Sequence, residues 1–386
     1  MLSVANPEVE SMRAAPAAAA VFSNHRADLD TKYYNFHGLF RLTVRSADPH
    51  VIRHFQAEYD AFEVDPCDNA DLDVTIGPFS LNDRTSAIAF GRFLMTDDWV
   101  YARERYKVAR WEFAFTAPAK DTIRLLFHGG MFSLDFAHHQ FVEPLLRYRV
   151  CQRGVVLVGG GSVVKDGRAV LVSGLGQTGK TALTLRQVLG GWSFQSDDMT
   201  FLSSGAQTYS YPRRLHVTDH MFAACPSAMR QLPIAHKLSI KGKKLIYEGS
   251  LRYGELQEAV AINQLVPGAA IEDIARLSAV LVLVAVPGTA LGRPRRLQGE
   301  ELLDRLMAIN GFECRAFTDV LWACHASGKA VSPAQWWQAE RALLERAVAG
   351  VPGFEVRVPR ELPDRRAVLE HTGRVLEEIY REGAVA

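Results

Sequence analysis

Short runs in the first 150 residues alternate between hydrophobic and polar side chains, which is the pattern of strands with one buried face. The predicted strands are residues 40–45, 71–76, 108–115 and 122–127. Apolar residues at helical spacing predict helices at 51–62 and 141–150. Because several strands follow one another without an intervening helix, we expect an α+β region with hairpins and an antiparallel sheet.

In the second part of the chain, longer apolar runs alternate with helical patterns, as in α/β folds. Strands are predicted at 168–173, 277–286 and 354–358, and helices at 181–189, 299–309, 338–348 and 364–380. We expect Leu185, Val188 and Leu189 on the buried face of the first of these helices, with Gly190-Gly191 ending it. Asp364 is the expected cap of the last helix.

The most specific segment of the chain lies between strand 168–173 and helix 181–189. Residues 174–181 read Gly-Leu-Gly-Gln-Thr-Gly-Lys-Thr and fit the phosphate-binding loop pattern G-x-x-x-x-G-K-[ST] at every defined position. Gly174, Gly176 and Gly179 allow several backbone amides to point at one anion. The N-terminus of the following helix adds positive potential. This segment predicts binding of a nucleoside triphosphate.

Lys180 and Thr181 supply the side-chain chemistry of the loop. A lysine at this position places its ammonium group against the outer phosphates, and the threonine hydroxyl ligates Mg²⁺. The predicted nucleotide-binding residues are Gly174, Leu175, Gly176, Gln177, Thr178, Gly179, Lys180, Thr181 and Ala182. The expected cofactors are ATP and Mg²⁺, although the sequence does not separate ATP from GTP.

Two adjacent carboxylates, Asp197 and Asp198, follow the loop and are flanked by apolar residues. Neighbouring anions repel each other and lose solvation at the end of a strand. A bound magnesium nucleotide removes that objection, because one carboxylate ligates the metal and the other accepts a proton from an incoming hydroxyl. A solvated Asp-Asp turn is the alternative. The short spacing from Lys180 favours the catalytic interpretation.

Composition excludes several classes of protein. The chain has 44 Lys and Arg against 43 Asp and Glu, so the basic excess of a nucleic-acid-binding protein is missing. Its five cysteines are scattered without C-x-x-C spacing, which indicates a reducing cytoplasm rather than a disulfide or zinc framework. Residues 1–20 lack the features of a signal peptide and are expected to form a flexible tail. The apolar run 277–286 is too short to span a bilayer, so we expect a soluble cytoplasmic protein without a nucleic-acid or membrane partner.

The loop, the helix after it and the segment Gly191-Trp192-x-x-x-Ser196-Asp197-Asp198 resemble the HPr kinase/phosphorylase group and the kinases related to it. The fold of that group is akin to phosphoenolpyruvate carboxykinase. Further similarity involves a strand-turn-strand at 154–167, the Tyr-Pro-Arg-Arg-Leu-His segment at 211–216, basic and aromatic residues at 241–244 and 252–254, and a last strand at 351–356. In total the resemblance covers residues 150–359.

The resemblance implies an α/β fold with a P-loop HPr kinase/phosphoenolpyruvate carboxykinase-like catalytic domain at 151–386. An N-terminal α+β domain at 21–150, a candidate for substrate recognition, precedes it. By the same resemblance Asp198 is the catalytic base, whereas Asp197 and Thr181 hold the metal; on sequence alone the two aspartates are interchangeable.

Two departures from the HPr kinase pattern matter. HPr kinases carry a histidine upstream of the loop strand, where this chain has Gly159-Gly160-Gly161, and a glutamate where it has Ala182. Both argue against reverse phosphorolysis and against HPr as the substrate. The related kinases with other acceptors are the closer likeness.

Several basic and histidine-containing segments are secondary candidates. Arg213 and Arg214 are expected either to contact phosphate or to be solvated turn residues. Lys243, together with Lys241 and Lys244, is either part of a substrate rim or a solvated loop. We interpret Asp97-Asp98 as a hairpin turn, His138-His139 as structural histidines and Cys324-His325 as a helix end.

The leading hypothesis is an ATP-dependent kinase that transfers the γ-phosphoryl group to a serine-type hydroxyl of a protein, peptide or small molecule. Its catalytic residues are Lys180, Asp197 and Asp198, because phosphoryl transfer depends on position and charge neutralisation. The alternative is a nucleotide-gated binding module that holds ATP without phosphorylating a substrate. The resemblance to oligomeric enzymes also favours self-association into a homo-oligomer.

Overall fold

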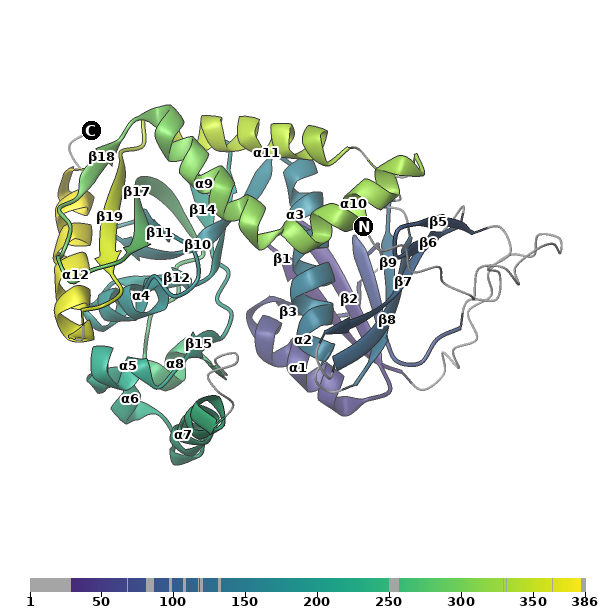
Figure 1. Ribbon diagram of the computed structural model, residues 1–386, viewed down its shortest axis with the longest axis horizontal. Coiled ribbons are helices and arrows are strands. Elements are labelled where there is room, and N and C mark those ends of the chain that lie inside the picture. The colour runs from purple at the N-terminus through teal and green to yellow at the C-terminus, as the bar shows by residue number, and fades with distance from the viewer. Residues whose placement is uncertain are drawn as a thin grey trace. The chain divides into compact units, whose positions relative to one another are not determined.

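The computed structural model describes residues 29–67, 69–80, 87–96, 99–106, 109–116, 118, 121–130, 133–249, 257–328, 330, 332–362 and 364–382. The predicted tail 1–20, Asp97-Asp98 and residues 252–254 lie outside these ranges. The chain is a mixed α/β protein with two large sheets, each in a compact unit of its own (Figure 1).

The division between the units differs from the expected boundary in one respect. The N-terminal unit consists of the described residues up to Arg149 together with Arg315–Trp336, and the C-terminal unit of Val150–Cys314 together with the described residues from Trp337 onward. The segment Arg315–Trp336, which the sequence places in the catalytic domain, therefore packs with the N-terminal unit. Contacts such as the ring packing of Tyr148 against Trp336 hold it there.

A nine-stranded sheet forms the body of the N-terminal unit. Its spatial order is β3 (Glu63–Val64), β1 (Asp30–Phe36), β2 (Phe40–Ser46), β4 (Leu72–Ile76), β9 (Ile123–Gly129), β8 (Ala109–Thr116), β7 (Trp99–Tyr106), β6 (Phe93–Met95) and β5 (Ile88–Phe90). The four predicted strands are present, but the expectation of an antiparallel sheet is wrong at its centre, where β4 pairs parallel with β2 and β9. Helix α1 (Pro49–Tyr59) connects β2 to β4 and returns the chain, as a parallel pairing requires.

The helices of the N-terminal unit bury aromatic and aliphatic side chains. They are α1, α2 (Leu134–Ala137), most of α3 (Glu143–Gln152) and α10 (Arg315–Ala326), with a 3₁₀ turn at Asp60–Phe62 and a π-helical turn at His138–Val142. The carboxylate of Asp48 caps α1 by accepting a hydrogen bond from the amide of His50 at 2.8 Å. His138 is buried with its ring nitrogen 2.5 Å from the hydroxyl of Tyr59, and His139 contacts Glu143. Cys324 and His325 lie in the last turn of α10, as predicted.

An eight-stranded sheet forms the body of the C-terminal unit. Its strands are β10 (Val155–Lys165), β11 (Arg168–Ser173), β12 (Ser193–Ser196), β13 (Met199–Ser203), β14 (Gln207–Tyr209), β17 (Ile274–Val286), β18 (Arg295–Leu297) and β19 (Gly353–Pro359). Because β11 also pairs with β17, five of these strands close into a ring in the order β10, β11, β17, β14, β13. The predicted strand-turn-strand at 154–167 is wrong, since β10 runs without interruption through Gly159, Gly160 and Gly161.

Helices and a small second sheet complete this unit. The helices are α4 (Lys180–Leu189), α5 (His220–Ala224), α6 (Pro226–Gln231), α7 (Ile234–Gly249), α8 (Ile262–Leu265), α9 (Gly299–Glu313), most of α11 (Pro333–Val348) and α12 (Arg365–Glu382). The small sheet pairs β15 (Leu215–Val217) with β16 (Glu258–Val260). Asp364 caps α12 as predicted, by accepting hydrogen bonds from the amides of Arg366 and Ala367. None of the helices in the described part of the chain is long and apolar enough to cross a membrane.

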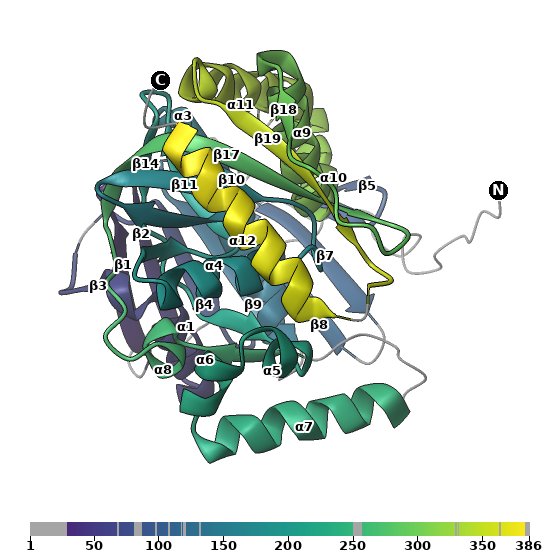
Figure 2. The same ribbon diagram turned by 90° about the vertical axis from the view of Figure 1, so that its left-hand side faces the viewer.

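The core of the C-terminal unit fixes α4, and with it the glycine loop, against the sheet. In Figure 2, α4 and α12 lie in front of the strands. Leu183, Leu185 and Val188 of α4 are buried in one cluster with side chains of α12 and β19. Leu189 is exposed, contrary to the prediction, and Leu183, which was not predicted, is buried. The end of α4 at Gly190 agrees with the sequence.

Candidate functional site

The loop 174–179 connects β11 to α4, and two of its glycines are required by its geometry. Gly174 has φ 154°, and a Cβ at this position would lie 2.6 Å from the carbonyl oxygen of Leu283. Gly179, at φ 95°, is in the left-handed region directly before the first helical residue. The loop therefore packs closely on β17 and turns into the helix where only glycine is unstrained.

Lys180 lies against the first two carbonyl groups of this loop. Its ammonium group donates hydrogen bonds to the carbonyl oxygens of Gly174 at 2.7 Å and Leu175 at 3.3 Å. The hydroxyl of Thr178 also donates to Leu175, at 2.9 Å. The side chain of Lys180 is largely buried, so its positive charge is held at the loop. At this position it would neutralise the charge of a bound phosphate group.

The acidic pair lies in the turn between β12 and β13 and is bonded to the start of α4. The hydroxyl of Thr181 donates a hydrogen bond of 2.9 Å to Oδ2 of Asp197. The carbonyl of Asp198 accepts a hydrogen bond of 2.7 Å from the amide of Gly160 on β10. The structure thus brings together Lys180, Thr181 and Asp197, which the sequence proposed as one site.

The glycines of β10 have a role in this site that sequence reasoning missed. A Cβ on Gly161 would lie 2.4 Å from the carbonyl oxygen of Asp197 and 3.0 Å from the hydroxyl of Thr184, and a Cβ on Gly160 would lie 2.8 Å from the carbonyl oxygen of Val172. The triple glycine therefore lets β10 approach both the acidic turn and β11. Its presence in an otherwise β-branched strand was the available signal, since glycine inside a strand marks a close backbone approach.

Asp197 and Asp198 have different environments. Asp197 is 4% exposed, and burial, followed by the charge of Asp198, raises the pKa of its carboxyl to about 7, against lowering contributions from Thr181, Lys180 and Arg213. Its Oδ1 is buried without a hydrogen-bond partner among the described residues. Asp198 is exposed. One carboxylate is thus buried, and the other is accessible to solvent.

These residues fit a magnesium nucleotide. The orphaned Oδ1 of Asp197 is the kind of hard oxygen that Mg²⁺ prefers, and the hydroxyl of Thr181 is beside it. The described residues contain no group of three or more His, Cys, Asp or Glu side chains able to hold a metal ion by themselves. A magnesium site here would take its other ligands from phosphate oxygens and water, as Mg²⁺ usually does.

The secondary candidates divide into one that lies near the acidic turn and others that do not. Arg213 is buried beside the ring of Tyr211, and the amide of Tyr211 donates to the carbonyl of Gln195 two residues before Asp197. Arg214 is half-buried. The carbonyl of Ala182 accepts a long hydrogen bond from the thiol of Cys225, so Ala182 packs against the interior of the unit.

Lys243 belongs to a helix rather than to a loop. It lies on α7, where its ammonium group pairs with the carboxylate of Glu258 at 2.5 Å. Its contacts are with Glu258 and the carbonyl of Gln257, not with the glycine loop. The expectation of a solvated loop at 241–244 is therefore wrong.

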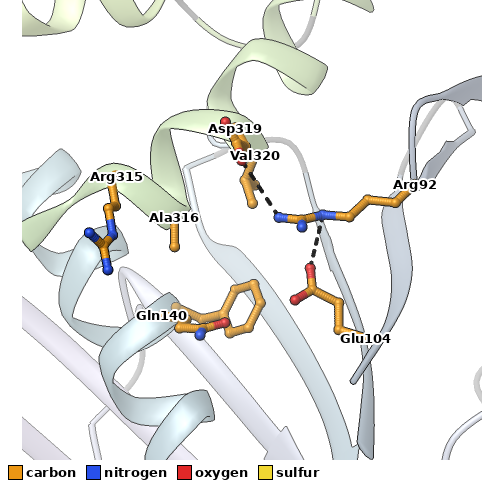
Figure 3. A pocket seen from close by; sticks show the side chains of 8 residues that line it. Arg92, Glu104, Gln140, Arg315, Ala316, Asp319 and Val320 are labelled. Carbon is orange, nitrogen blue, oxygen red and sulfur yellow. Dashed lines mark ion pairs between the residues drawn. The ribbon is translucent and has the colours of Figure 1, made fainter. Parts of the chain in front are cut away.

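A cavity of about 400 Å³ lies in the N-terminal unit and contains none of the predicted site residues. Arg92 lies between two carboxylates, 3.2 Å from Glu104 and 3.8 Å from Asp319 (Figure 3). Gln140 and Phe141 from the π-helical turn also line it. Burial raises the pKa of Glu104, and Arg92 lowers it in part. The acidic groups of this cavity are therefore compensated by a neighbouring arginine.

No protein-family model matches this chain, and no curated protein matches it either. Among solved structures, the chain is similar to the Hpr(Ser) kinase/phosphatase from Coxiella burnetii, with a TM-score of 0.27 and 10% sequence identity. The alignment covers 59% of this chain and 96% of that one. A likeness at this level carries no argument about activity.

Proposed function

We propose that this protein is an ATP-dependent kinase, related to the HPr kinases, that transfers the γ-phosphoryl group to a hydroxyl. The observation that carries the proposal is the hydrogen bond from Thr181 to Asp197, because it joins a glycine loop of phosphate-binding sequence to a buried carboxylate. The ammonium group of Lys180 lies at the same loop. The site would thus offer groups that bind a nucleotide phosphate, groups that bind a metal ion, and a carboxylate that accepts a proton.

Each residue has a definite task in this reaction. The loop amides and Lys180 bind the β- and γ-phosphates and neutralise their charge. Thr181 and Asp197 hold Mg²⁺, which when bound offsets the charge that develops on the phosphate oxygens. The oxygen of the acceptor hydroxyl bonds to the γ-phosphorus, and Asp198 accepts the proton of that hydroxyl. The bond from that phosphorus to the bridging oxygen breaks, and ADP leaves.

Labelled phosphate transfer with an Asp198→Asn variant tests the proposal. The protein is incubated with Mg²⁺, γ-labelled ATP and an extract that supplies protein and small-molecule acceptors. Wild type should label an acceptor, whereas Asp198→Asn should reduce labelling about 10²- to 10⁴-fold, the range expected for loss of a general base. ATP affinity should change by less than about threefold, because the side chain is exposed and is not assigned to the phosphates.

Asp304→Asn is the matched control, since Asp304 is an exposed aspartate on α9 of the same unit. Labelling by this control should equal that of wild type. Full labelling by Asp198→Asn would contradict its role as the base. Tight ATP binding with no transfer by wild type to any acceptor would instead support the nucleotide-gated binding module.

A further inference from the structure

Helix α7 packs on the C-terminal unit through its polar side. Three of its side chains converge on the carboxylate of Glu258: His236 and Ser239 at 2.7 Å and Lys243 at 2.5 Å. Ile240 is its single buried aliphatic residue. Burial by itself would raise the pKa of Glu258, but the hydrogen bonds from Lys243, Ser239 and His236 lower it. The inner side of α7 is thus held mainly by polar contacts to β16.

The apolar side of the same helix faces away from the protein. The exposed fractions are 74% for Ile234, 64% for Leu238, 72% for Leu245 and 60% for Ile246. At about 100° per residue, the first three point within roughly 40° of one another, and Ile246 flanks them. These four residues form what we call the α7 stripe. A row of exposed aliphatic side chains at helical spacing is typical of an interaction site, because a helix on the surface of a protein normally buries its aliphatic side.

Positive charge borders the α7 stripe. Lys241 is exposed between Leu238 and Leu245, and no ion pair joins it to a carboxylate in the described part of the chain. Lys237 is half-buried and donates to the carbonyl oxygen of Arg230, and no ion pair joins it to a carboxylate among the described residues. Lys243 and Lys244 differ, since Glu258 and Asp219 compensate them. A partner that covers the stripe would therefore gain from carboxylates at its edge.

The size of the α7 stripe indicates a transient partner. From Ile234 to Ile246 the helix rises about 18 Å, at roughly 1.5 Å per residue. Four aliphatic side chains cover a few hundred Å², well below the roughly 800 Å² per partner of a stable interface. If two copies packed through α7 alone, the buried area would thus be too small for a stable dimer. A narrow stripe at helical spacing is suited to a second amphipathic helix.

Helix α7 is linked to the candidate site through β16, β15 and the segment before β15. Glu258 belongs to β16, which pairs with β15, and β15 begins two residues after Arg213. The segment before β15 lies beside β12, because Tyr211 forms a bridge with Ser196 and its amide donates to Gln195. A continuous series of hydrogen-bonded segments therefore joins helix α7 to the strand that precedes Asp197. In Figure 2, α7 lies below α5 and α6, away from the large sheet.

We propose that the α7 stripe docks an acidic amphipathic helix of a protein that accepts the phosphoryl group. This inference rests on the proposed kinase function and narrows its acceptor to a protein. The apolar side of the acceptor helix would cover Ile234, Leu238 and Leu245, and its glutamates or aspartates would pair with Lys237 and Lys241.

Peptide binding tests the docking surface without phosphorylation. The probe is a fluorescent 18-residue helical peptide with leucines at i, i+4 and i+11 and glutamates on both flanks, and its twin carries lysines instead. The full-length protein should bind the acidic peptide with a dissociation constant of roughly tens of micromolar. Binding should be at least about tenfold weaker for the lysine twin and for the Leu238→Ser/Leu245→Ser variant.

Leu291→Ser is the matched control, because Leu291 is an exposed leucine of the same unit outside α7. Circular dichroism and thermal unfolding establish that each variant is folded. Equal affinity of wild type and the α7 variant for the acidic peptide would overturn the proposal. So would failure of the acidic peptide to bind while α7-dependent binding to phosphatidylserine vesicles occurs, which would assign the stripe to lipid.

Acceptor labelling then separates this proposal from the kinase proposal. Wild type with γ-labelled ATP and extract should label a protein, and Leu238→Ser/Leu245→Ser should label it at least about tenfold less while binding ATP equally. Label confined to small molecules would overturn the docking role and leave the kinase intact. Binding of the acidic peptide without transfer to any acceptor would leave α7 as a partner surface and remove the kinase activity.

Discussion

Two clusters of charge, one in each unit, show opposite ways of holding a carboxylate. In the N-terminal unit, Arg92 lies between Glu104 and Asp319 and compensates both. In the C-terminal unit, Asp197 is buried beside another carboxylate, and its Oδ1 has no hydrogen-bond partner among the described residues. The first pair of carboxylates has a cationic neighbour, whereas the second would gain one if a cation were bound.

The difference teaches that the two clusters are electrostatically unlike: one carboxylate has an arginine beside it, and the other is buried next to a like charge. The cavity of about 400 Å³ has mixed charges that neutralise one another. The loop and the acidic turn combine a close glycine approach, a lysine bonded to two loop carbonyls and a carboxylate oxygen without a hydrogen-bond partner among the described residues. If this interpretation is right, substitutions at the two clusters should affect different properties.

Lys180→Ala should have the largest effect. Loss of its ammonium group removes charge neutralisation at the outer phosphates, so labelled phosphate transfer should fall about 10³-fold or more. The free energy of unfolding should fall by only about 1 to 3 kcal/mol, because the carbonyl groups of Gly174 and Leu175 lose one hydrogen-bond donor. Transfer within about tenfold of wild type would show that the loop does not serve phosphoryl chemistry.

Gly161→Ala should destabilise the protein through one methyl group. Its Cβ would lie 2.4 Å from the carbonyl oxygen of Asp197, so β10 or the acidic turn must move, at a cost of about 2 to 3 kcal/mol in the free energy of unfolding. Gly205→Ala is the control, since the nearest atom to its Cβ would be Oγ of Ser203, 3.8 Å away. Urea unfolding measures the free energy of unfolding of both variants. Equal values for Gly161→Ala and Gly205→Ala would refute the close approach of β10 to the acidic turn.

The raised pKa of Asp197 predicts a pH-dependent stability in the absence of metal and nucleotide. The folded-state pKa is about 7, against 3.8 for an unperturbed aspartate. The stabilisation from the bound proton is therefore fully present below the unfolded pKa and is lost as pH rises through about 7. The free energy of unfolding should therefore fall by about 2 to 3 kcal/mol between roughly pH 5 and pH 8. Asp197→Asn should remove this component, and an unchanged pH profile in that variant would contradict the assignment.

Arg92→Ala should have the smallest effect of the series. Arg92 is about half exposed, and a solvent-screened pair of this kind contributes less than about 1 kcal/mol to stability. Phosphate transfer should remain at the wild-type rate, because Arg92 belongs to the other cluster. A large loss of transfer would show that the N-terminal cluster takes part in the reaction and would break the contrast between the two regions.

The sequence predicted much of the fold because periodicity records burial within an element. Strands such as β2, β4, β11 and β17 and helices α4, α9 and α12 were found at nearly their observed positions. The parallel pairings of β4 escaped prediction, because pairing partners depend on distant segments. Helix α7 was not predicted, and its residues 241–244 were expected in a substrate rim or a solvated loop. Its polar side faces the protein and its aliphatic side faces solvent, which inverts the usual pattern.

The site was predictable as far as its residues are adjacent in sequence or follow a fixed loop pattern. Lys180 and Thr181 belong to such a pattern, and the hydrogen bond from Thr181 joins them to Asp197 as expected. The contribution of Gly160 and Gly161 depends on how closely β10 passes the acidic turn, which no local pattern expresses. Likewise, the pairing of Lys243 with Glu258 needed the tertiary structure to place two distant segments together.

Isothermal titration calorimetry of the folded, full-length protein with ATP and Mg²⁺ tests the central claim most directly. We predict saturable binding that requires Mg²⁺, that is weakened at least about tenfold in Lys180→Ala and that is retained in Arg92→Ala. The absence of any binding by well-folded wild-type protein, with ATP and with GTP, would contradict a nucleotide site at this loop.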